Sequence, residues 1–331
     1  MKQAIAAAVL SKTGLGALLC RANRWSGVLA FNYHRVGDGR GTLFDRGLWS
    51  ADAESFADQL RCWKSCLDVI SPDDLPDVLS RRRGRYALVT FDDGYRDNYE
   101  TAFPILRTEK VPAAFFVSTG FLDSPRLPWW DEIAWMVRTS RRASILLPGW
   151  IPGELTFDEP DREQAVRALL VAYKAMAAES TDRFVAAIAE ATGSGRPGPG
   201  HAGKLWMTWD MVREMKKSGM VIAGHTLSHV VLARSSRKRQ QEEISGCAAR
   251  LSAELGDPMR HFSYPVGSRT SFDAVTVACL REAGVRFAFS YYGGFRRFSD
   301  WDDYDIRRVA IETYLTRDWA RSLAALPQVF S

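Results

Sequence analysis

Short apolar runs rich in β-branched and aromatic residues alternate along this chain with segments typical of helices. Such runs occupy 28–33, 86–91, 113–118, 220–223, 261–264, 286–291 and 306–311. Helical patterns separate them at 53–64, 98–108, 209–218, 240–255 and 272–283. Strands that alternate with helices are typical of βα units, which place their strands in one parallel sheet. About seven strands is the count of a barrel, so the sequence predicts an α/β barrel.

The βα rhythm breaks between Leu122 and Lys204. This segment contains LPWWDEIAW, helical patterns at 161–178 and 182–191, and the stretch GSGRPGPGHAG, which is typical of a flexible linker. We interpret it as a helical insertion into the barrel, and its helices could serve either in packing or as a lid or membrane-facing element. The predicted organisation is therefore a lead-in at 1–27, a first barrel part at 28–121, a helical insertion with a Gly/Pro linker at 122–204, and a second barrel part at 205–331.

The N-terminal stretch MKQAIAAAVLSKTGLGALLC resembles a signal sequence at first sight, but Lys12 interrupts its apolar run and no small-x-small cleavage site follows. A membrane span needs about 18 apolar residues. We therefore predict an amphipathic lead-in helix that can touch a membrane surface. The five cysteines lack CxxC spacing, which favours a reducing compartment. Together these features favour a cytoplasmic protein that can contact a membrane surface peripherally.

The formal charge of +5 comes from scattered Arg and Lys, with local runs at 81–83 and 237–239. Basic runs of this kind are usually solvated faces. No signature with interleaved aromatic residues accompanies them, so the sequence argues against nucleic acid as a partner.

Two adjacent carboxylates, Asp92 and Asp93, follow the apolar run 86–91, and Gly94 comes next. Ligands of α/β folds gather at the carboxyl ends of the strands. Two buried neighbouring carboxylates repel each other, so a cation or a proton must relieve the repulsion. The pattern indicates a metal or acid–base site, or alternatively an aspartate that caps the following helix.

His225 and His229 lie four residues apart directly after the apolar run 220–223, and they are two of only five histidines in the chain. On a helix, this spacing presents both imidazoles to one metal. A zinc protease with an HExxH motif is disfavoured, because Thr226 follows the first histidine and no glutamate stands between the two. The general base must come from elsewhere, and the aspartate pair can supply it.

Together the two motifs supply three metal ligands, Asp93, His225 and His229, and leave a fourth position for water, as in catalytic zinc sites. Asp92 is then free to act as the general base. The metal would lower the pKa of its water and polarise a substrate carbonyl. The sequence therefore predicts a metal-dependent hydrolase.

The motif TFDDGY at 90–95 followed by HTLSH at 225–229 resembles the first two motifs of the polysaccharide deacetylase family, also called the NodB-homology family of carbohydrate esterases. The resemblance covers about 28–311, with 122–204 outside the common core. It implies a distorted (β/α)7-type barrel and hydrolysis of an N-acetyl, or occasionally O-acetyl, group on carbohydrate. It also implies a divalent metal, most often Zn²⁺, with Co²⁺, Ni²⁺ or Mn²⁺ as alternatives. Carried over residue by residue, the base falls on Asp92 and the ligands on Asp93, His225 and His229.

The third family motif, Arg-x-Pro-x-Gly, appears here as SYPVG at 263–267, so Ser263 replaces the arginine that orients the base. Arg308, in the late run IRRVAI, is our candidate for its replacement, with a surface or structural ion pair as the alternative. The residues predicted to line or support the substrate groove are Tyr95, Ser263, Tyr264, Pro265, Gly267 and Arg308.

The last family motif supplies a histidine as general acid near the C-terminus, but no histidine follows His261 in this chain. His34, in the segment NYHRV after the first strand, resembles the histidine that serves as acid in exopolysaccharide deacetylases with a permuted pattern. We predict that His34 is catalytic, with a structural histidine at a strand end as the alternative. His201 and His261 are expected to be non-catalytic.

The indoles of Trp129 and Trp130 could stack on a sugar ring or pack in a core. The whole pattern predicts a metal-dependent carbohydrate N-deacetylase, whose partner is an N-acetylated amino sugar of a polysaccharide or lipid-linked saccharide, in exopolysaccharide or cell-envelope biosynthesis. A deformylase of a lipid-linked amino sugar and a catalytically silent carbohydrate-binding barrel remain open alternatives. The missing groove arginine and late histidine favour the silent barrel, whereas the retained metal triad with a separate base argues against it.

Overall fold

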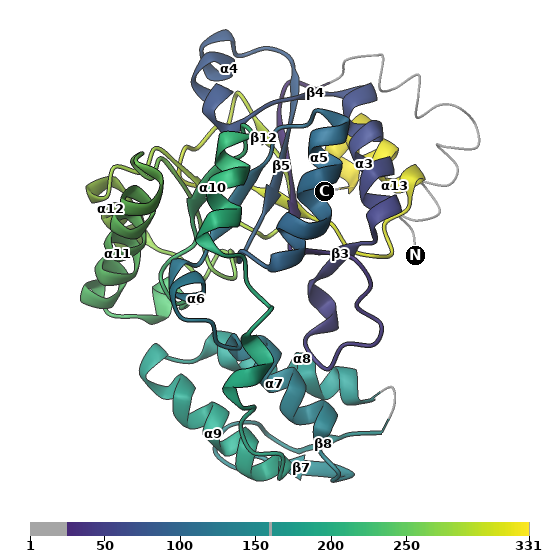
Figure 1. The fold of residues 1–331 in the computed structure, drawn as a ribbon, viewed down its shortest axis with the longest axis vertical. Coiled ribbons are helices and arrows are strands. Elements are labelled where there is room, and N and C mark those ends of the chain that lie inside the picture. Colours follow the sequence, from purple (N-terminus) through teal and green to yellow (C-terminus); the bar gives the residue numbers. More distant parts are fainter. Residues whose placement is uncertain (1–24, 159–160, 331) are drawn as a thin grey trace.

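The computed structural model describes residues 25–158 and 161–330 (Figure 1). In the described residues, the centre of the fold is a curled sheet of seven parallel strands. In spatial order these are β13 (Arg308–Ala310), β1 (Gly27–Tyr33), β5 (Arg85–Phe91), β6 (Ala114–Val117), β9 (Val221–Gly224), β10 (His261–Ser263) and β11 (Phe287–Phe289). A single parallel bridge joins Phe289 to Ile306, just before β13, so the two edges of the sheet approach each other. The predicted α/β class and (β/α)7-type barrel are confirmed.

Shorter strands extend this sheet or lie beside it. Within the main sheet, β4 runs parallel to β5 and β12 runs antiparallel to β1. The parallel pair β2/β3 and the antiparallel pair β7/β8 stand apart from it. Their bounds are β2 (Arg35–Val36), β3 (Trp49–Ala51), β4 (Asp68–Val69), β7 (Ser144–Leu146), β8 (Glu154–Thr156) and β12 (Arg296–Arg297).

Side chains of the central strands alternate between two apolar cores. In β1, Val28 and Ala30 face the interior of the curled sheet, while Leu29 and Phe31 pack against the surrounding helices. Because both faces are buried, the strands read as nearly continuous apolar runs. At the carboxyl end of β1 the next interior position is Asn32, a fully buried polar residue. The interior is therefore apolar along most of the sheet and becomes polar at the carboxyl ends of the strands.

Helices surround the sheet, as Figure 1 shows, with α3, α5 and α13 packed together and α11 packed on α12. The segment 98–102 is a short π-helix that leads into α5. The helices of this part are α3 (Ala53–Cys66), α4 (Leu75–Arg81), α5 (Phe103–Glu109), α6 (Thr119–Asp123), α10 (Trp209–Lys217), α11 (Arg237–Leu255), α12 (Ala274–Glu282), α13 (Arg317–Ala325) and α14 (Pro327–Phe330).

Local sequence explains where these helices begin and which side they bury. The side chain of Asp52 caps α3 by accepting a hydrogen bond from the Ser55 amide, and Phe56, Leu60 and Trp63 follow at helical spacing on its buried face. Helices α4 and α13 were not expected from the sequence.

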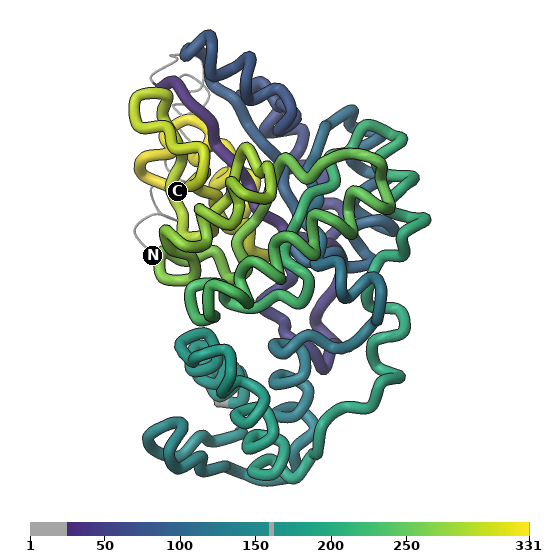
Figure 2. The backbone as a smooth tube through the Cα atoms, turned by 90° about the vertical axis from the view of Figure 1, so that its left-hand side faces the viewer, coloured from purple at the N-terminus to yellow at the C-terminus, as the bar shows by residue number. Residues whose placement is uncertain are grey.

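A separate helical lobe stands below the barrel in Figure 1, and Figure 2 shows the same lobe from the side. It consists of α7 (Trp129–Thr139), α8 (Asp161–Ala175), α9 (Thr181–Thr192) and the pair β7/β8 around its own apolar core. Residues outside 122–204, among them Tyr95, Phe121 and Trp206, contribute to that core. The lobe lies within the segment that we propose as a helical insertion.

The structure adds one helix to this lobe and corrects one expectation about it. The tryptophan-rich segment is itself a helix, α7, in which the buried residues Trp130, Ile133, Ala134 and Val137 recur at helical spacing. The Gly/Pro stretch is not a free linker, since Arg196 within it donates two hydrogen bonds to the Glu132 carboxylate on α7.

The predicted lead-in helix lies outside the described residues, apart from its last three positions. No helix in residues 25–158 and 161–330 is long and apolar enough to cross a membrane.

Candidate metal centre and acid–base site

The polar residues of the site lie where the central strands end. Asp92 and Asp93 follow β5, His225 follows β9, and Ser263 ends β10. Adjacent parallel strands bring their carboxyl ends to one edge of the sheet, so these residues, distant in sequence, meet there. Asp93 has a positive φ of 76°, which turns the chain sharply after the strand.

Asp93, His225 and His229 form a buried cluster. The Oδ1 atom of Asp93 lies 3.4 Å from Nε2 of His225 and 3.3 Å from Nε2 of His229. The three potential ligand atoms lie within 4.8 Å of one another. Oδ1 of Asp93 has no hydrogen-bond partner within the described residues. A carboxylate oxygen and two imidazole nitrogens around one point are the donor set of a divalent transition metal, so these residues fit such an ion.

The tautomer of His225 suits a metal ligand. Its Nδ1 lies 2.7 Å from the carbonyl oxygen of Ser263, and only an Nδ1–H can hydrogen-bond to a carbonyl. In the neutral imidazole Nε2 then carries the lone pair, and it faces Asp93. A backbone carbonyl that fixes a ligating imidazole in this way is a common support of metal sites.

His225 and His229 do not share a helix, which corrects the helical presentation suggested by their spacing. Residues 225–230 form an irregular loop in which Thr226 and His229 have positive φ of 66° and 57°. The amide of His229 donates to Oγ1 of Thr226 at 2.9 Å, and the amide of Ser228 donates to Glu243 on α11 at 2.8 Å. The loop thus brings both imidazoles to Asp93 without helical geometry.

Arg308 lies against Asp92, the predicted base. Its Nη1 and Nη2 donate to Oδ1 and Oδ2 of Asp92, each at 2.8 Å, and the arginine is fully buried. Nη2 also donates to the hydroxyl of Ser263 at 2.7 Å. The serine at the family's arginine position therefore leaves room that Arg308 enters from another strand. Arg308 therefore has the position needed to replace the missing arginine, and it forms a buried ion pair with Asp92.

The charge state of both carboxylates follows from these contacts. Burial raises the pKa of Asp92, but Arg308 and His225 outweigh burial, and the net pKa is below its usual value. Burial likewise raises the pKa of Asp93, yet His225 and His229 hold the pKa of that carboxyl far below its usual range. Both aspartates are therefore charged at neutral pH.

Asn32 completes the support of Asp92 and was missed by the sequence reasoning. Its amide nitrogen donates to Oδ2 of Asp92 at 3.2 Å, and its amide oxygen accepts from Arg308 at 2.6 Å and from Thr90 at 3.0 Å. The available signal was a polar residue at the carboxyl end of an otherwise apolar run. Glu243, which holds the loop of His229, was also missed, and no local pattern in α11 marks it.

A pocket of about 260 Å³ opens over these residues. Its lining includes Asp92, Asp93, His225 and His229 together with His34, Trp129, Trp130, Lys174, Val266 and Tyr291. Trp130 meets His229 edge to face, with ring centroids 4.3 Å apart. The two tryptophans are buried in the lobe's core and also line the pocket, and their stacking on a sugar ring stays a prediction.

His34 lies in the same pocket at the carboxyl end of β1. Its imidazole is partly exposed and stands edge to face with Tyr291, with ring centroids 5.3 Å apart. Burial lowers the pKa of His34, and the nearby Asp93 and Asp92 offset this only in part. The position suits the predicted role in proton transfer, and that role stays a prediction.

Four of the predicted groove or support residues fit only a supporting position. Tyr95 is fully buried, and its hydroxyl accepts from the Trp130 indole at 2.7 Å. Tyr264 points into the core, where its ring stacks on Phe272. Neither tyrosine is among the residues that line the pocket, so both fit the supporting role that was predicted beside groove lining. Pro265 is buried as well. Gly267 has a φ of 65°, and a Cβ there would meet the Tyr291 backbone nitrogen at 2.6 Å, so glycine lets Tyr291 reach the pocket.

The remaining expectations concern capping and the other histidines. Neither Asp92 nor Asp93 caps a helix, because the N-cap position of the following π-helix is Asp97. His261 lies outside the pocket, with Nε2 2.8 Å from Oδ1 of Asp73. His201 lies in the lobe, where its ring faces Trp135 at 5.4 Å.

A parallel α/β barrel with a polar pocket at the carboxyl ends of its strands has the architecture of a barrel enzyme. The family model of polysaccharide deacetylases matches residues 80–141 and 154–288. The chain belongs to the polysaccharide deacetylase family, which confirms the resemblance seen in its motifs.

Solved structures share this fold. The Streptococcus pyogenes deacetylase PplD, in complex with acetate, superimposes with a TM-score of 0.58 at 15% identity, over 92% of this chain and 98% of that one. IcaB from Ammonifex degensii superimposes with a TM-score of 0.56 at 21% identity, over 92% of this chain and 98% of that one. A de-N-acetylase from Aggregatibacter actinomycetemcomitans superimposes with a TM-score of 0.54 at 18% identity, over 87% of this chain and 95% of that one. At these identities the likeness establishes the fold. No curated protein matches the sequence.

Proposed function

We propose that this protein is a metal-dependent N-deacetylase of an amino sugar in a polysaccharide or lipid-linked saccharide, in exopolysaccharide or cell-envelope biosynthesis. One observation carries the proposal: a buried Asp-His-His cluster and a second aspartate, Asp92, held charged by Arg308, line one pocket. We further propose a cytoplasmic protein that contacts a membrane surface through its N-terminal stretch.

Asp93, His225 and His229 would hold the metal, most readily Zn²⁺, with Co²⁺, Ni²⁺ or Mn²⁺ as alternatives for the same donors. When bound, the ion would activate a water molecule and polarise the acetyl carbonyl. The rest of the chemistry falls to side chains of the chain itself.

Asp92 would take the proton from the attacking water. Among the described residues its Oδ2 atom receives three hydrogen bonds, from Asn32, Ser263 and Arg308, whereas Oδ1 receives one. Oδ1 therefore keeps the acceptor capacity that a general base needs. The bidentate contact with Arg308 fixes the plane of the carboxylate, so Oδ1 is held in one orientation.

His34 would return a proton to the amine that leaves. Its lowered pKa makes the protonated imidazole a stronger acid, and it also reduces the fraction that carries a proton at neutral pH. A step that needs protonated His34 is therefore lost as the pH rises through its pKa. The neighbouring Trp129 and Trp130 would present apolar ring surface to the sugar.

Replacing His34 with alanine is expected to lower the turnover number about 100-fold or more, because a general acid usually contributes that much. Metal content is expected to stay unchanged, since His34 is not one of the three proposed ligands. Turnover and bound metal are measured on the same preparations, with His201→Ala as the matched control outside the pocket. Turnover near that of the wild type would remove His34 from the mechanism.

The proposed reaction is tested by a screen of N-acetyl and N-formyl amino sugars, free and lipid-linked, with Zn²⁺ or Co²⁺ added. Acetate release is the expected result, and acetate bound to the S. pyogenes relative supports the choice of acyl group. Formate release in its place would establish a deformylase. A metal-loaded protein that releases neither acid from any of these compounds would indicate a catalytically silent barrel.

A further inference from the structure

A second, larger cavity of about 420 Å³ lies beside the pocket of the metal centre. Trp129 lines both, and Ser228 on its far side precedes the proposed ligand His229. Cavities of roughly 300–1,000 Å³ are typical of small-molecule sites. The two spaces therefore share Trp129 as part of their walls.

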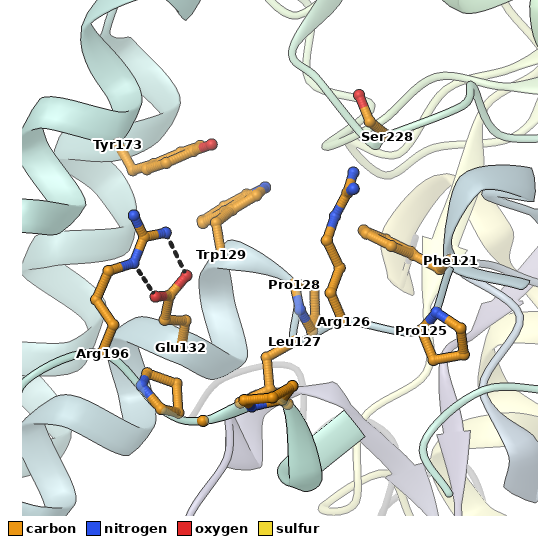
Figure 3. A pocket seen from close by; sticks show the side chains of 13 residues that line it. Phe121, Pro125, Arg126, Leu127, Pro128, Trp129, Glu132, Tyr173, Arg196 and Ser228 are labelled. Carbon is orange, nitrogen blue, oxygen red and sulfur yellow. Dashed lines mark hydrogen bonds and ion pairs between the residues drawn. The ribbon is translucent and has the colours of Figure 1, made fainter. Parts of the chain in front are cut away.

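The polar groups of this cavity that lack a partner in the described part of the chain are hydrogen-bond donors. Nε1 of Trp129 has no hydrogen-bond partner within the described residues, although the side chain is only 9% exposed. Figure 3 shows this nitrogen pointing across the cavity toward the Arg126 guanidinium, with the Ser228 hydroxyl on the same side. An indole N–H and a guanidinium donate hydrogen bonds and accept none, so they suit a ligand rich in acceptor oxygens.

The charge of the cavity is positive. Glu132, the acidic residue of its lining, is neutralised by Arg196, which donates two hydrogen bonds to it. Arg126 forms no ion pair in residues 25–158 and 161–330, and its guanidinium lies 5.3 Å from the centroid of the Phe121 ring. An uncompensated guanidinium attracts an anionic group and can bind it through two parallel hydrogen bonds.

The start of α7 adds to this preference. The helix begins at Trp129, its N-cap residue is Pro128, and no side chain caps its free amides. Both residues line the cavity. The positive end of a helix dipole stabilises a negative charge close to it. Two independent features, an unpaired arginine and a buried unpartnered indole N–H, thus coincide with an uncapped helix start.

The walls of this cavity are partly aromatic. Trp129 stacks on Tyr173 with ring centroids 4.0 Å apart and an interplanar angle of 8°. Phe121 forms part of the opposite side in Figure 3. Flat aromatic surfaces suit the C–H faces of a sugar ring, as polar groups at the rim suit its oxygens.

We propose that this cavity is a second subsite for the saccharide and binds a negatively charged group, a uronate carboxylate or a phosphate, next to the acetylated amino sugar. The inference rests on the proposed function and narrows its substrate class from amino sugars in general to anionic saccharides. Arg126 and the indole N–H of Trp129 would hold the charged group.

The test measures binding by calorimetry to the full chain for three probes: a disaccharide of hexuronic acid and N-acetylglucosamine, N-acetylglucosamine 1-phosphate, and neutral N,N′-diacetylchitobiose. At least one anionic probe is expected to bind about tenfold more tightly than the neutral one, as one charge-assisted hydrogen bond allows. The preferred anionic probe distinguishes the carboxylate from the phosphate. Arg126→Gln and Trp129→Phe are each expected to reduce that preference, whereas Arg141→Gln, an exposed arginine of the same lobe outside the cavity, retains it.

Equal or tighter binding of the neutral probe, no binding of any probe, or a preference that survives in the Arg126→Gln, Trp129→Phe double variant would overturn the subsite. Acetate release is measured in parallel on the same probes. A protein that prefers the anionic probe and releases no acetate would support the subsite while contradicting the deacetylase activity, so the two failures are distinguishable.

Discussion

Replacing Asp92 with asparagine is expected to lower acetate release by about 10²–10⁴-fold, the usual contribution of a general base. The side-chain amide has nearly the same shape, but it cannot take a proton from water. The metal should stay bound, because the proposed ligands Asp93, His225 and His229 are intact. Turnover and metal stoichiometry measured together separate loss of the base from loss of the metal centre.

Asp77→Asn is a suitable control for this variant. Asp77 is an exposed aspartate on α4, which lies at the opposite end of the barrel from the helical lobe in Figure 1, and it does not line the pocket. The same change there should leave turnover unchanged. Turnover of the Asp92→Asn protein within a factor of about three of the wild type would show that another group acts as the base.

Replacing Arg308 with methionine is expected to lower the free energy of unfolding by about 3–5 kcal/mol, the usual cost of removing one partner from a buried ion pair. Arg308 is fully buried, and its loss leaves the buried Asp92 carboxylate without its bidentate cationic partner. The pKa of Asp92 would rise, because burial then acts with less opposition. Urea denaturation followed by circular dichroism measures the change.

A double variant tests whether the effect comes from the ion pair. Arg308→Met combined with Asp92→Asn removes the buried charge, so the double variant should be less destabilised than the sum of the two single variants by about 1 kcal/mol or more. Strict additivity would show that Arg308 acts through packing alone. It would also remove the argument that Arg308 stands in for the arginine missing at Ser263.

Much of the fold was predictable because the strands are buried on both faces. The apolar runs at 28–33 and 86–91 match β1 and β5 to within one residue, since parallel strands covered by helices are apolar throughout. Asp92, Asp93 and His225 could be placed together because each lies within two residues of the end of such a run. The three-dimensional meeting of these residues follows from the parallel order of the strands.

Other features depend on contacts that the sequence does not record locally. The loop of His229 is held by Glu243, 14 positions further along, which accepts a hydrogen bond from the Ser228 amide, and no local pattern marks the positive φ angles of Thr226 and His229. Tyr95 is separated from the aspartates only by Gly94, yet its ring turns into the core of the helical lobe. The lobe's helix α7 was missed because its aromatic residues serve a core of its own, outside the βα rhythm.

The most direct test of the account is to remove divalent metal from the purified protein with a chelator and titrate Zn²⁺ back, while bound metal and acetate release are measured on one sample. We expect no acetate release without metal and a rise that ends at one equivalent, whereas His225→Ala should neither bind the ion stoichiometrically nor recover activity. Undiminished acetate release by the metal-free protein, or full activity of His225→Ala, would contradict a metal centre built from Asp93, His225 and His229.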